Sequence, residues 1–301
     1  MIELTRRQFL ERSLPAAALS LSAFALGVPR RRLPLGLQLY SVRQMLALDF
    51  EQTLRQIGEL GYREVEAAGF YGRSATQVAS AMRSAGLACV SAHYTFDQLA
   101  TTLDQIIDFG NQLGLRYIIC SFPGFRDPGR VQGKSYQEKV ASFTLEDLCW
   151  SAHKFNDFGR KVHAAGMQFG YHNHTMEFAS QDGEVPYDSM IRIADPQLVT
   201  FEMDCGWVII GGGDPVSYLR RYPHRISLLH VKDFKGQRKP FTITDSPDAA
   251  ELGRGIIPNE QILIAARAAH VHHCFVEQEE YDMPPLEALK LDAEFMHDHS
   301  L

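Results

Sequence analysis

The chain has 301 residues, of which 45% are hydrophobic and 22% charged, and its formal net charge is −6. This composition is typical of a globular protein, and the length suits one large α/β domain or two smaller domains. No long run of lysine or arginine lies outside the N-terminal segment, so the basic surface that nucleic-acid binding needs is not expected.

Residues 1–30 have the pattern of an export signal. Arg6 and Arg7 precede Gln8-Phe9-Leu10, and a short, alanine-rich apolar stretch follows. The paired arginines resemble a twin-arginine signal, which a receptor reads. The apolar stretch is too short for a comfortable transmembrane span, and an amphipathic N-terminal helix is the alternative. We expect the twin-arginine translocation machinery to carry the protein to the periplasm, where an uncleaved signal would anchor it to the membrane.

Short β-rich runs alternate with helical patterns through the rest of the chain. Several helical patterns end in a glycine just before the next run, namely Gly61, Gly86, Gly114 and Gly166, as helix C-caps do. This alternation predicts a parallel sheet with right-handed crossovers. The predicted strands are residues 34–40, 62–69, 87–94, 115–122, 167–174, 198–204, 226–233 and 272–279.

Eight strands after the leader predict a closed (β/α)8 TIM barrel, a fold of about 250 residues. An open doubly wound sheet would need a glycine-rich turn after the first strand, but that strand continues into LYSVRQM. We therefore predict a single barrel domain over residues 31–301. The long connections 123–144 and 234–257 follow predicted strands, so we expect them to form a lid or a substrate clamp.

The cysteines do not predict a disulfide framework. Their number is odd, no CxxC pair occurs, and three of them lie inside apolar strand-like runs, where free buried thiols are usual. The five cysteines are Cys89, Cys120, Cys149, Cys205 and Cys274.

Polar residues two positions apart stand at or near the ends of the predicted strands. Alternate side chains of a strand share a face, and the C-terminal ends of barrel strands form the mouth where active sites lie. Any one pair could face solvent, but buried carboxylates that converge need a cation or hydrogen bonds. The pairs are Gln38 with Tyr40, Glu64 with Glu66, Ser91 with His93, His172 with His174, Glu202 with Asp204, His230 with Lys232, and Glu277 with Glu279.

One ligand from each of four adjacent strands gives a predicted metal site of His172, Asp204, His230 and Glu277. Two nitrogens and two oxygens suit Mn²⁺, Zn²⁺, Co²⁺ or Fe²⁺ better than Ca²⁺, with Mg²⁺ as an alternative. A cation at this place would polarise a bound carbonyl and acidify the neighbouring C–H group. The predicted chemistry is therefore proton removal beside a carbonyl.

Five segments, GYREVEAAGFYG, FGYHNHTMEF, FEMDCGWVIIGGGDP, LLHVKD and ELGRG, carry a resemblance that runs from about Leu35 to the C-terminus. They resemble the xylose isomerase-like TIM barrel family, and more narrowly its sugar phosphate isomerase/epimerase branch. The resemblance implies a divalent metal at the barrel mouth, with Asp204, His230 and Glu277 at ligand positions. It also places His172 where the epimerases carry a glutamate, which breaks the symmetry of their two-carboxylate mechanism.

Two further departures from the family accompany His172. Trp207 stands where the epimerases tend to carry a histidine, and it would offer an apolar face to a sugar ring. Residues 257–259 read Ile-Pro-Asn, where relatives often carry an aspartate.

Two residues are predicted to be catalytic. Glu277 would serve as both metal ligand and base, and Lys232 would stabilise an enediolate, bind an anionic group or act as an acid. An ion pair with Glu202 or Glu279 is the alternative for Lys232. Glu177 would either orient a histidine or cap the next helix. The predicted substrate contacts are Tyr40, Glu66, His93, His174 and Trp207, with a plain core role as the alternative for Tyr40, His93 and Trp207.

These patterns predict a divalent-metal-dependent sugar isomerase or epimerase that acts through an enediolate. A lyase, dehydratase or hydrolase on a 3-keto-glycoside or an inosose is the enzyme alternative, because it shares the proton-abstraction step. A periplasmic sugar-binding protein is the non-enzyme alternative. The expected partners are a small carbohydrate and, by resemblance to the family, a second copy of the chain in a homo-oligomer.

Overall fold

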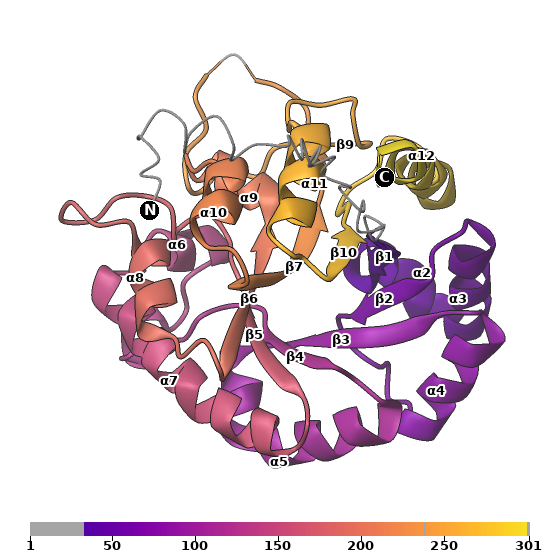
Figure 1. Cartoon of the computed structure of the whole chain (residues 1–301), viewed down its shortest axis with the longest axis horizontal. Coiled ribbons are helices and arrows are strands. Elements are labelled where there is room, and N and C mark those ends of the chain that lie inside the picture. Colours follow the sequence, from indigo (N-terminus) through magenta and orange to yellow (C-terminus); the bar gives the residue numbers. More distant parts are fainter. Residues whose placement is uncertain (1–32, 238, 300–301) are drawn as a thin grey trace, which may run out of the picture. The chain divides into compact units, whose positions relative to one another are not determined.

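The computed structural model describes residues 33–237 and 239–299, so the predicted export signal lies outside the described residues. Eight strands close into a barrel with the neighbour order β1-β10-β7-β6-β5-β4-β3-β2, and all eight neighbouring pairs are parallel (Figure 1). The predicted TIM barrel is confirmed. The strands are β1 (Leu35–Gln38), β2 (Glu64–Ala67), β3 (Ala88–Tyr94), β4 (Tyr117–Cys120), β5 (Gln168–His172), β6 (Val199–Asp204), β7 (Ile226–Val231) and β10 (His273–Val276).

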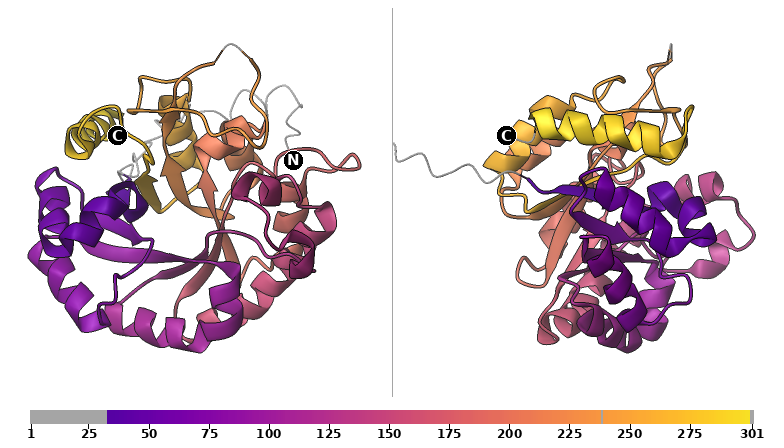
Figure 2. Two further views of the ribbon diagram at one scale, coloured as in Figure 1. Left: turned by 180° about the vertical axis from the view of Figure 1, so that it is seen from behind. Right: turned by 90° about the vertical axis from the view of Figure 1, so that its right-hand side faces the viewer.

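Helices surround the barrel, as the views from behind and from the side show (Figure 2). None of the helices within residues 33–237 and 239–299 has the length and apolar character needed to cross a membrane. The outer helices are α3 (Phe50–Glu59), α4 (Ala75–Ser84), α5 (Phe96–Leu113), α7 (Leu145–Ala164), α8 (Pro186–Ile193), α10 (Pro215–Arg221), α11 (Asn259–Ala268) and α12 (Pro285–His299). Shorter helices are η1 (Leu39–Val42), α2 (Arg43–Leu48), η2 (Pro128–Val131), α6 (Tyr136–Val140) and α9 (Cys205–Ile210).

Local sequence fixes the helix ends. Ser74, Thr95 and Thr144 each begin a helix with a capping box, in which the hydroxyl accepts a hydrogen bond from the third backbone N–H. The four glycines predicted as C-caps all have left-handed φ angles: Gly61 (100°), Gly86 (68°), Gly114 (82°) and Gly166 (83°). Such angles cost glycine little, so the chain can turn from each helix into the next strand.

The barrel interior divides into an apolar part and an ionic part. Val90, Tyr117, Ile119, Leu228 and Phe275 form a buried apolar cluster of their own inside the barrel. A Cβ on Gly36 would lie 2.6 Å from the Phe275 ring, so glycine at this strand position makes room for the aromatic side chain. We call this cluster the apolar plug. The carboxylates and imidazoles of the barrel mouth lie beyond it, toward the strand C-termini.

A carboxylate clamp holds the long connection that follows β7. Strand β8 (Asp233–Phe234) pairs antiparallel with β9 (Ala249–Ala250). The Asp233 carboxylate accepts hydrogen bonds from the backbone N–H groups of Gly253, Gly255 and Ile257 at 3.0, 2.9 and 2.9 Å. A Cβ on Gly255 would lie 2.2 Å from Asp233 Oδ1, so the ELGRG turn needs glycine there.

Candidate functional site

The predicted metal ligands come from the ends of neighbouring strands. His172 ends β5, Asp204 ends β6, His230 lies on β7, and Glu277 follows β10. Asn173 ties the first two ends together, because its amide nitrogen donates to the Asp204 carbonyl at 3.3 Å and its oxygen accepts from the Asp204 N–H at 3.1 Å. The geometry of parallel strands thus gathers these side chains at one place.

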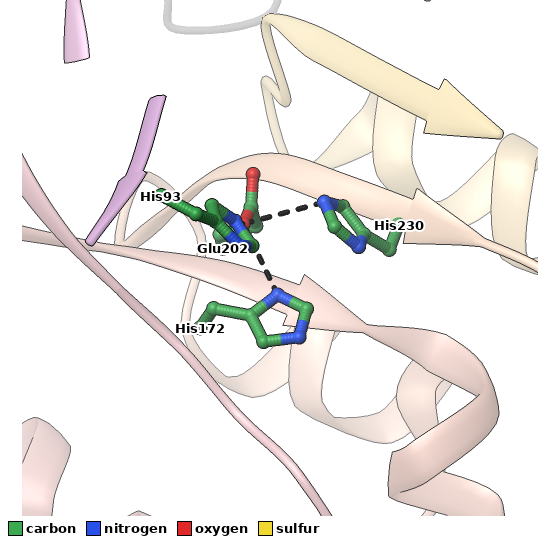
Figure 3. A group of neighbouring side chains, drawn as sticks. All are labelled: His93, His172, Glu202 and His230. Carbon is green, nitrogen blue, oxygen red and sulfur yellow. Dashed lines mark hydrogen bonds and ion pairs between the residues drawn. The ribbon is translucent and has the colours of Figure 1, made fainter. Parts of the chain in front are cut away.

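An inner layer of carboxylates and imidazoles lies directly above the apolar plug. Glu202 Oε2 lies 2.7 Å from His93 Nε2, 3.1 Å from His172 Nδ1 and 3.4 Å from His230 Nε2. Figure 3 shows the three imidazoles gathered around this carboxylate. Glu66 Oε1 lies 2.7 Å from the Nε2 atoms of both His93 and His230. Glu66 and Glu202 are fully buried, and their second carboxylate oxygens, Glu66 Oε2 and Glu202 Oε1, have no hydrogen-bond partner.

An outer layer lies nearer the mouth. His230 Nδ1 is 3.0 Å from Glu277 Oε2 and 3.8 Å from Asp204 Oδ2, and His172 Nε2 is 4.0 Å from the same Asp204 oxygen. The Lys232 ammonium lies 2.8 Å from Glu277 Oε2, 2.9 Å from Asp204 Oδ2 and 3.2 Å from Glu279 Oε1. The ion pair with Glu279 that we set against a catalytic Lys232 is therefore present, and it joins two pairs with predicted metal ligands.

His172 and His230 bridge the two layers. Each ring presents one nitrogen to an inner carboxylate and the other to the outer layer. Metal-binding histidines in proteins have this arrangement, in which one nitrogen is free for the metal and the other is hydrogen-bonded to a carboxylate that fixes the ring. The carboxylates of the inner layer can thus fix the orientation of the two rings, whose other nitrogens face the outer layer.

Within the described residues, two sets of donor atoms lie close enough together to hold one ion. One set is His93, His172, Glu202 and His230, and the other is Asp204, His230 and Glu277. The four predicted ligands therefore do not form a single compact set, because His172 falls in the first and Asp204 and Glu277 in the second. His230 belongs to both.

The chemistry of the outer set fits a divalent cation. Asp204 Oδ1 accepts a hydrogen bond from the Trp207 N–H at 2.8 Å and caps α9. Asp204 Oδ2 is buried and lies 2.9 Å from the Lys232 ammonium, 3.8 Å from His230 Nδ1 and 4.0 Å from His172 Nε2. A buried anionic oxygen in this state is stabilised by a cation.

Burial and mutual charge shift the pKa values of these groups in different directions. Burial opposes protonation of His93, but Glu66 and Glu202 outweigh it and raise the pKa of His93 to about 9. Burial and the Glu66 charge raise the pKa of Glu202 to about 7. For Glu277, burial would raise the pKa, but Lys232 and His230 hold it well below its ordinary value. Glu277 is therefore ionised near neutral pH.

Two histidines differ from His93 in charge. Burial and the His230 ring lower the pKa of His172 well below its ordinary value. Burial and the Lys232 ammonium lower the pKa of His174 to about 3. Both imidazoles are therefore neutral near pH 7, and a neutral ring nitrogen can bind a metal or accept a hydrogen bond.

A cavity of about 1170 Å³ opens over the two layers. Four of the five predicted substrate contacts line it, namely Tyr40, His93, His174 and Trp207, together with His172 and Glu277. Glu66 does not: it is fully buried and lies beneath the cavity, hydrogen-bonded to Gln38 at 2.7 Å. Lys232 lines a small hollow beside the cavity, with its ammonium 4.7 Å from the Trp207 ring centroid.

The strand-end pattern gave Glu202 no role beyond an alternative ion pair with Lys232, and it placed Glu66 in contact with the substrate. Both residues stand at register shifts, between Val65 and Glu66 and between Phe201 and Glu202. Such bulges re-aim a side chain, and here they bring both carboxylates into one layer. One signal in the sequence could have revealed the inner layer. Glu202 precedes Asp204 by two positions on the same strand, so it lies one step deeper in the barrel than the residue at the mouth. Glu177 orients the backbone rather than a ring, since it accepts a hydrogen bond from the His174 N–H at 3.1 Å.

Comparison with known proteins adds a family and several relatives. The sequence profile of the xylose isomerase-like TIM barrel family matches residues 54–299. An inosose dehydratase from Clostridium botulinum (strain Alaska E43 / Type E3) is 24% identical over 193 residues, which are 62% of this chain and 64% of that protein. The chain thus spans slightly less than two thirds of that relative's length.

Two solved structures resemble the fold. A sugar phosphate isomerase/epimerase from Parabacteroides distasonis ATCC 8503 superposes with a TM-score of 0.69 at 25% identity, covering 87% of this chain and 97% of that one. The IOLI protein with a bound zinc atom superposes with a TM-score of 0.68 at 13% identity, covering 89% of this chain and 98% of that one.

Proposed function

We propose that this chain, which belongs to the xylose isomerase-like TIM barrel family, is a divalent-metal-dependent lyase that dehydrates a keto-sugar or an inosose. The observation that carries the proposal is the asymmetry of the outer layer. Two carboxylates, Glu277 and Glu279, line the cavity beside the Lys232 ammonium, while neutral His172 and His174 line it elsewhere. The two carboxylates therefore stand together rather than opposed.

The metal would be held by Asp204, His230 and Glu277, and His172 Nε2, which lies 4.0 Å from Asp204 Oδ2, would complete the set of four that the sequence predicts. The outward nitrogens of His172 and His230, which both turn toward Asp204 Oδ2, support this choice over the inner set. Glu66 and Glu202 would then hold the two rings by their other nitrogens. When bound, a divalent ion such as Mn²⁺, Zn²⁺, Co²⁺ or Fe²⁺ polarises the substrate carbonyl and stabilises negative charge on its oxygen.

The residues of the chain supply the proton transfers. Glu277 takes the proton from the carbon beside the carbonyl, and the C–H electron pair forms the double bond. The C–O bond on the next carbon, the second from the carbonyl, breaks. The proton held on Glu277 passes to the departing hydroxyl, which leaves as water. Lys232 keeps its proton, because the three carboxylates around it raise its pKa against the effect of burial, and its charge stabilises the electron-rich oxygen.

The inosose dehydratase relatives support dehydration. Isomerisation or epimerisation, our first prediction, is the second candidate, because it shares the proton removal and returns the proton to carbon. The Parabacteroides structure favours this candidate, and the imidazole of His172 in place of a second carboxylate stands against it.

The test is to incubate the purified protein with Mn²⁺, Co²⁺ or Zn²⁺ in heavy water with an inosose or a 3-keto-glucoside. With the inosose, dehydration predicts loss of the proton beside the carbonyl in the proton NMR spectrum and a product lighter by one water in the mass spectrum. The 3-keto-glucoside carries no hydroxyl on the second carbon from its carbonyl, so the same elimination would release its aglycone alcohol instead of water. Isomerisation predicts deuterium incorporation with no loss of water. Glu277→Gln is the control and should stop both. Tight binding of the ketones with no exchange under any ion would identify the protein as a sugar-binding protein instead.

We also propose export to the periplasm through the twin-arginine route. Arg6 and Arg7 support this proposal. Replacing both with lysine (R6K/R7K) should keep the protein in the cytoplasmic fraction of a host that has this machinery, and cell fractionation measures the distribution. Equal periplasmic amounts of both proteins would contradict the assignment.

A further inference from the structure

The cavity over the site is larger than the proposed reaction needs. Its volume of about 1170 Å³ exceeds the roughly 300–1,000 Å³ of pockets that bury a drug-sized molecule. A single six-membered polyol ring is much smaller than such a molecule. The unused space lies beyond the ionic floor and is enclosed by the long connection that follows β4, residues 121–140.

This outer wall is aromatic. Phe122, Phe125 and Tyr136 line it. The Phe122 ring centroid lies 5.7 Å from that of Tyr136 and 5.3 Å from that of His174, so the wall continues directly from the ionic floor. Tyr136 is 53% exposed and Tyr40, on the cavity lining, is 41% exposed. Exposed aromatic faces beside a polar site offer apolar contact area to a second flat ring.

Several polar groups around the cavity are already engaged by the protein. Thr95 and Gln98 bond to each other's backbone N–H in the capping box of α5. The Ser121 hydroxyl donates to the Tyr94 carbonyl at 3.2 Å, and Asp245 accepts from the Thr242 N–H at 2.7 Å. Among the described lysines and arginines, Lys139 alone lines the cavity. The wall therefore suits a neutral ring with few hydroxyls better than a phosphate or a second sugar.

We propose that the substrate is an aryl glycoside: the keto-sugar ring lies over His93, His174 and Glu277, and an aromatic aglycone packs against Phe122 and Tyr136. The sugar half of this assignment rests on the proposed function. The aglycone half rests on the cavity wall alone. The substrate class is thus a neutral molecule of two rings, of which one is a carbohydrate and the other is aromatic.

The test measures binding without turnover, by titration calorimetry of the metal-loaded protein. The probes are phenyl β-glucoside, methyl β-glucoside and cellobiose. Phenyl β-glucoside should bind about tenfold more tightly than methyl β-glucoside, the gain expected for one aromatic contact. Tyr136→Ala should abolish that ratio by weakening only the phenyl compound. Tyr71→Ala removes an exposed tyrosine that does not line the cavity and should leave the ratio unchanged.

Equal affinity for the phenyl and methyl glucosides, or tighter binding of cellobiose than of the phenyl compound, would overturn the proposal. So would a Tyr136→Ala variant that keeps the tenfold ratio. The heavy-water experiment is separate. Proton exchange without an aryl preference would contradict this inference alone. An aryl preference without proton exchange would contradict the proposed reaction but would still support an aromatic aglycone against the wall.

Discussion

The two ends of the barrel treat charge in different ways. At the N-terminal end, Glu64 Oε2 lies 2.7 Å from His273 Nδ1, one carboxylate against one imidazole, and the apolar plug lies between this end and the mouth. At the mouth, five carboxylates (Glu66, Glu202, Asp204, Glu277 and Glu279) surround one ammonium and the rings of His93, His172 and His230. One end is balanced by its own residues, whereas the other has an excess of anionic groups.

This difference indicates which end of the barrel needs a bound ion. A single carboxylate with a hydrogen-bonding partner needs nothing further, whereas an excess of buried carboxylates favours a bound cation. The same parallel strands carry both ends, so the fold alone does not decide the function. The residues at strand C-termini decide it.

The largest expected effect is on bound metal. His230→Ala or Asp204→Asn should abolish bound metal, because each removes a proposed ligand. Glu202→Gln should lower the affinity for the metal by about 10–100-fold, because Glu202 orients ligand rings without binding the ion itself. Elemental analysis of the purified proteins measures the content. His273→Ala, at the opposite end, should leave the content unchanged. Full metal in both His230→Ala and Asp204→Asn would remove the distinction between the two ends. Loss with Glu202→Gln but not Asp204→Asn would move the ion to the inner set.

A second effect, on stability, belongs to the apolar plug. Leu228 is fully buried in it, and Leu228→Ala should lower the free energy of unfolding by about 2–5 kcal/mol because it leaves a cavity. Chemical denaturation measures the change. Leu48→Ala, at a residue that is 89% exposed on α2, should change it by less than about 0.5 kcal/mol. Loss of metal from a folded Leu228→Ala protein would show that plug and mouth are not independent.

A buried carboxylate outside both ends predicts a pH dependence. Asp292 on α12 accepts a hydrogen bond from the Leu252 N–H at 2.7 Å, and burial raises its pKa to about 7. The folded protein therefore binds this proton more tightly than the unfolded chain does, so its stability should fall as pH rises from about 4 to 7. Asp292→Asn keeps an accepting oxygen and cannot ionise.

Relative to wild type, Asp292→Asn should gain stability as pH rises across that range, by a few kcal/mol in total. Denaturant titrations at pH 4, 5.5 and 7 measure it. Asp157→Asn, on the surface of α7, is the matched control and should run parallel to wild type. Parallel curves for Asp292→Asn as well would mean that its carboxyl titrates alike in the folded and unfolded chains.

The smallest expected effect concerns the path of Lys232. A Cβ on Gly206 would lie 2.6 Å from Lys232 Cγ and 2.8 Å from Cδ, so Gly206→Ala should displace the ammonium from Glu277. We expect roughly a tenfold loss in the rate of proton exchange, the cost of about one weakened charge contact, with bound metal unchanged. Gly183→Ala, in a turn away from the cavity, should leave the rate at the wild-type value. An unchanged rate in Gly206→Ala would place Lys232 outside the chemistry.

The barrel and much of the mouth could be predicted from the sequence because both follow from local rules. Alternating strand and helix patterns gave the eight strands within a few residues, and glycines gave the helix ends. His172, Asp204, His230 and Glu277 could be placed at the mouth because strand ends meet there. These inferences need the topology but no detailed packing.

The division into two layers could not be predicted. It depends on the register shifts at Glu66 and Glu202. Each shift moves the pairing with the neighbouring strand by one residue and so changes the direction in which the carboxylate points. A period-two pattern assumes that no such shift occurs. For that reason Glu66 was expected at the substrate, whereas it lies beneath the cavity floor. Each histidine turns one ring nitrogen toward the mouth because of its hydrogen-bond partners on other strands. The sequence does not show which of these partners each ring meets.

The Asp233 clamp has a consequence for how this protein can change. It fastens the ELGRG turn to the residue next to Lys232 and secures both ends of the connection between β8 and β9, of which residues 235–237 and 239–248 are described. Insertions or substitutions within that connection can be accepted without shifting the ammonium group. Descendants of such a chain can therefore acquire new ligand preferences by altering a tethered strap while the reactive floor stays as it is.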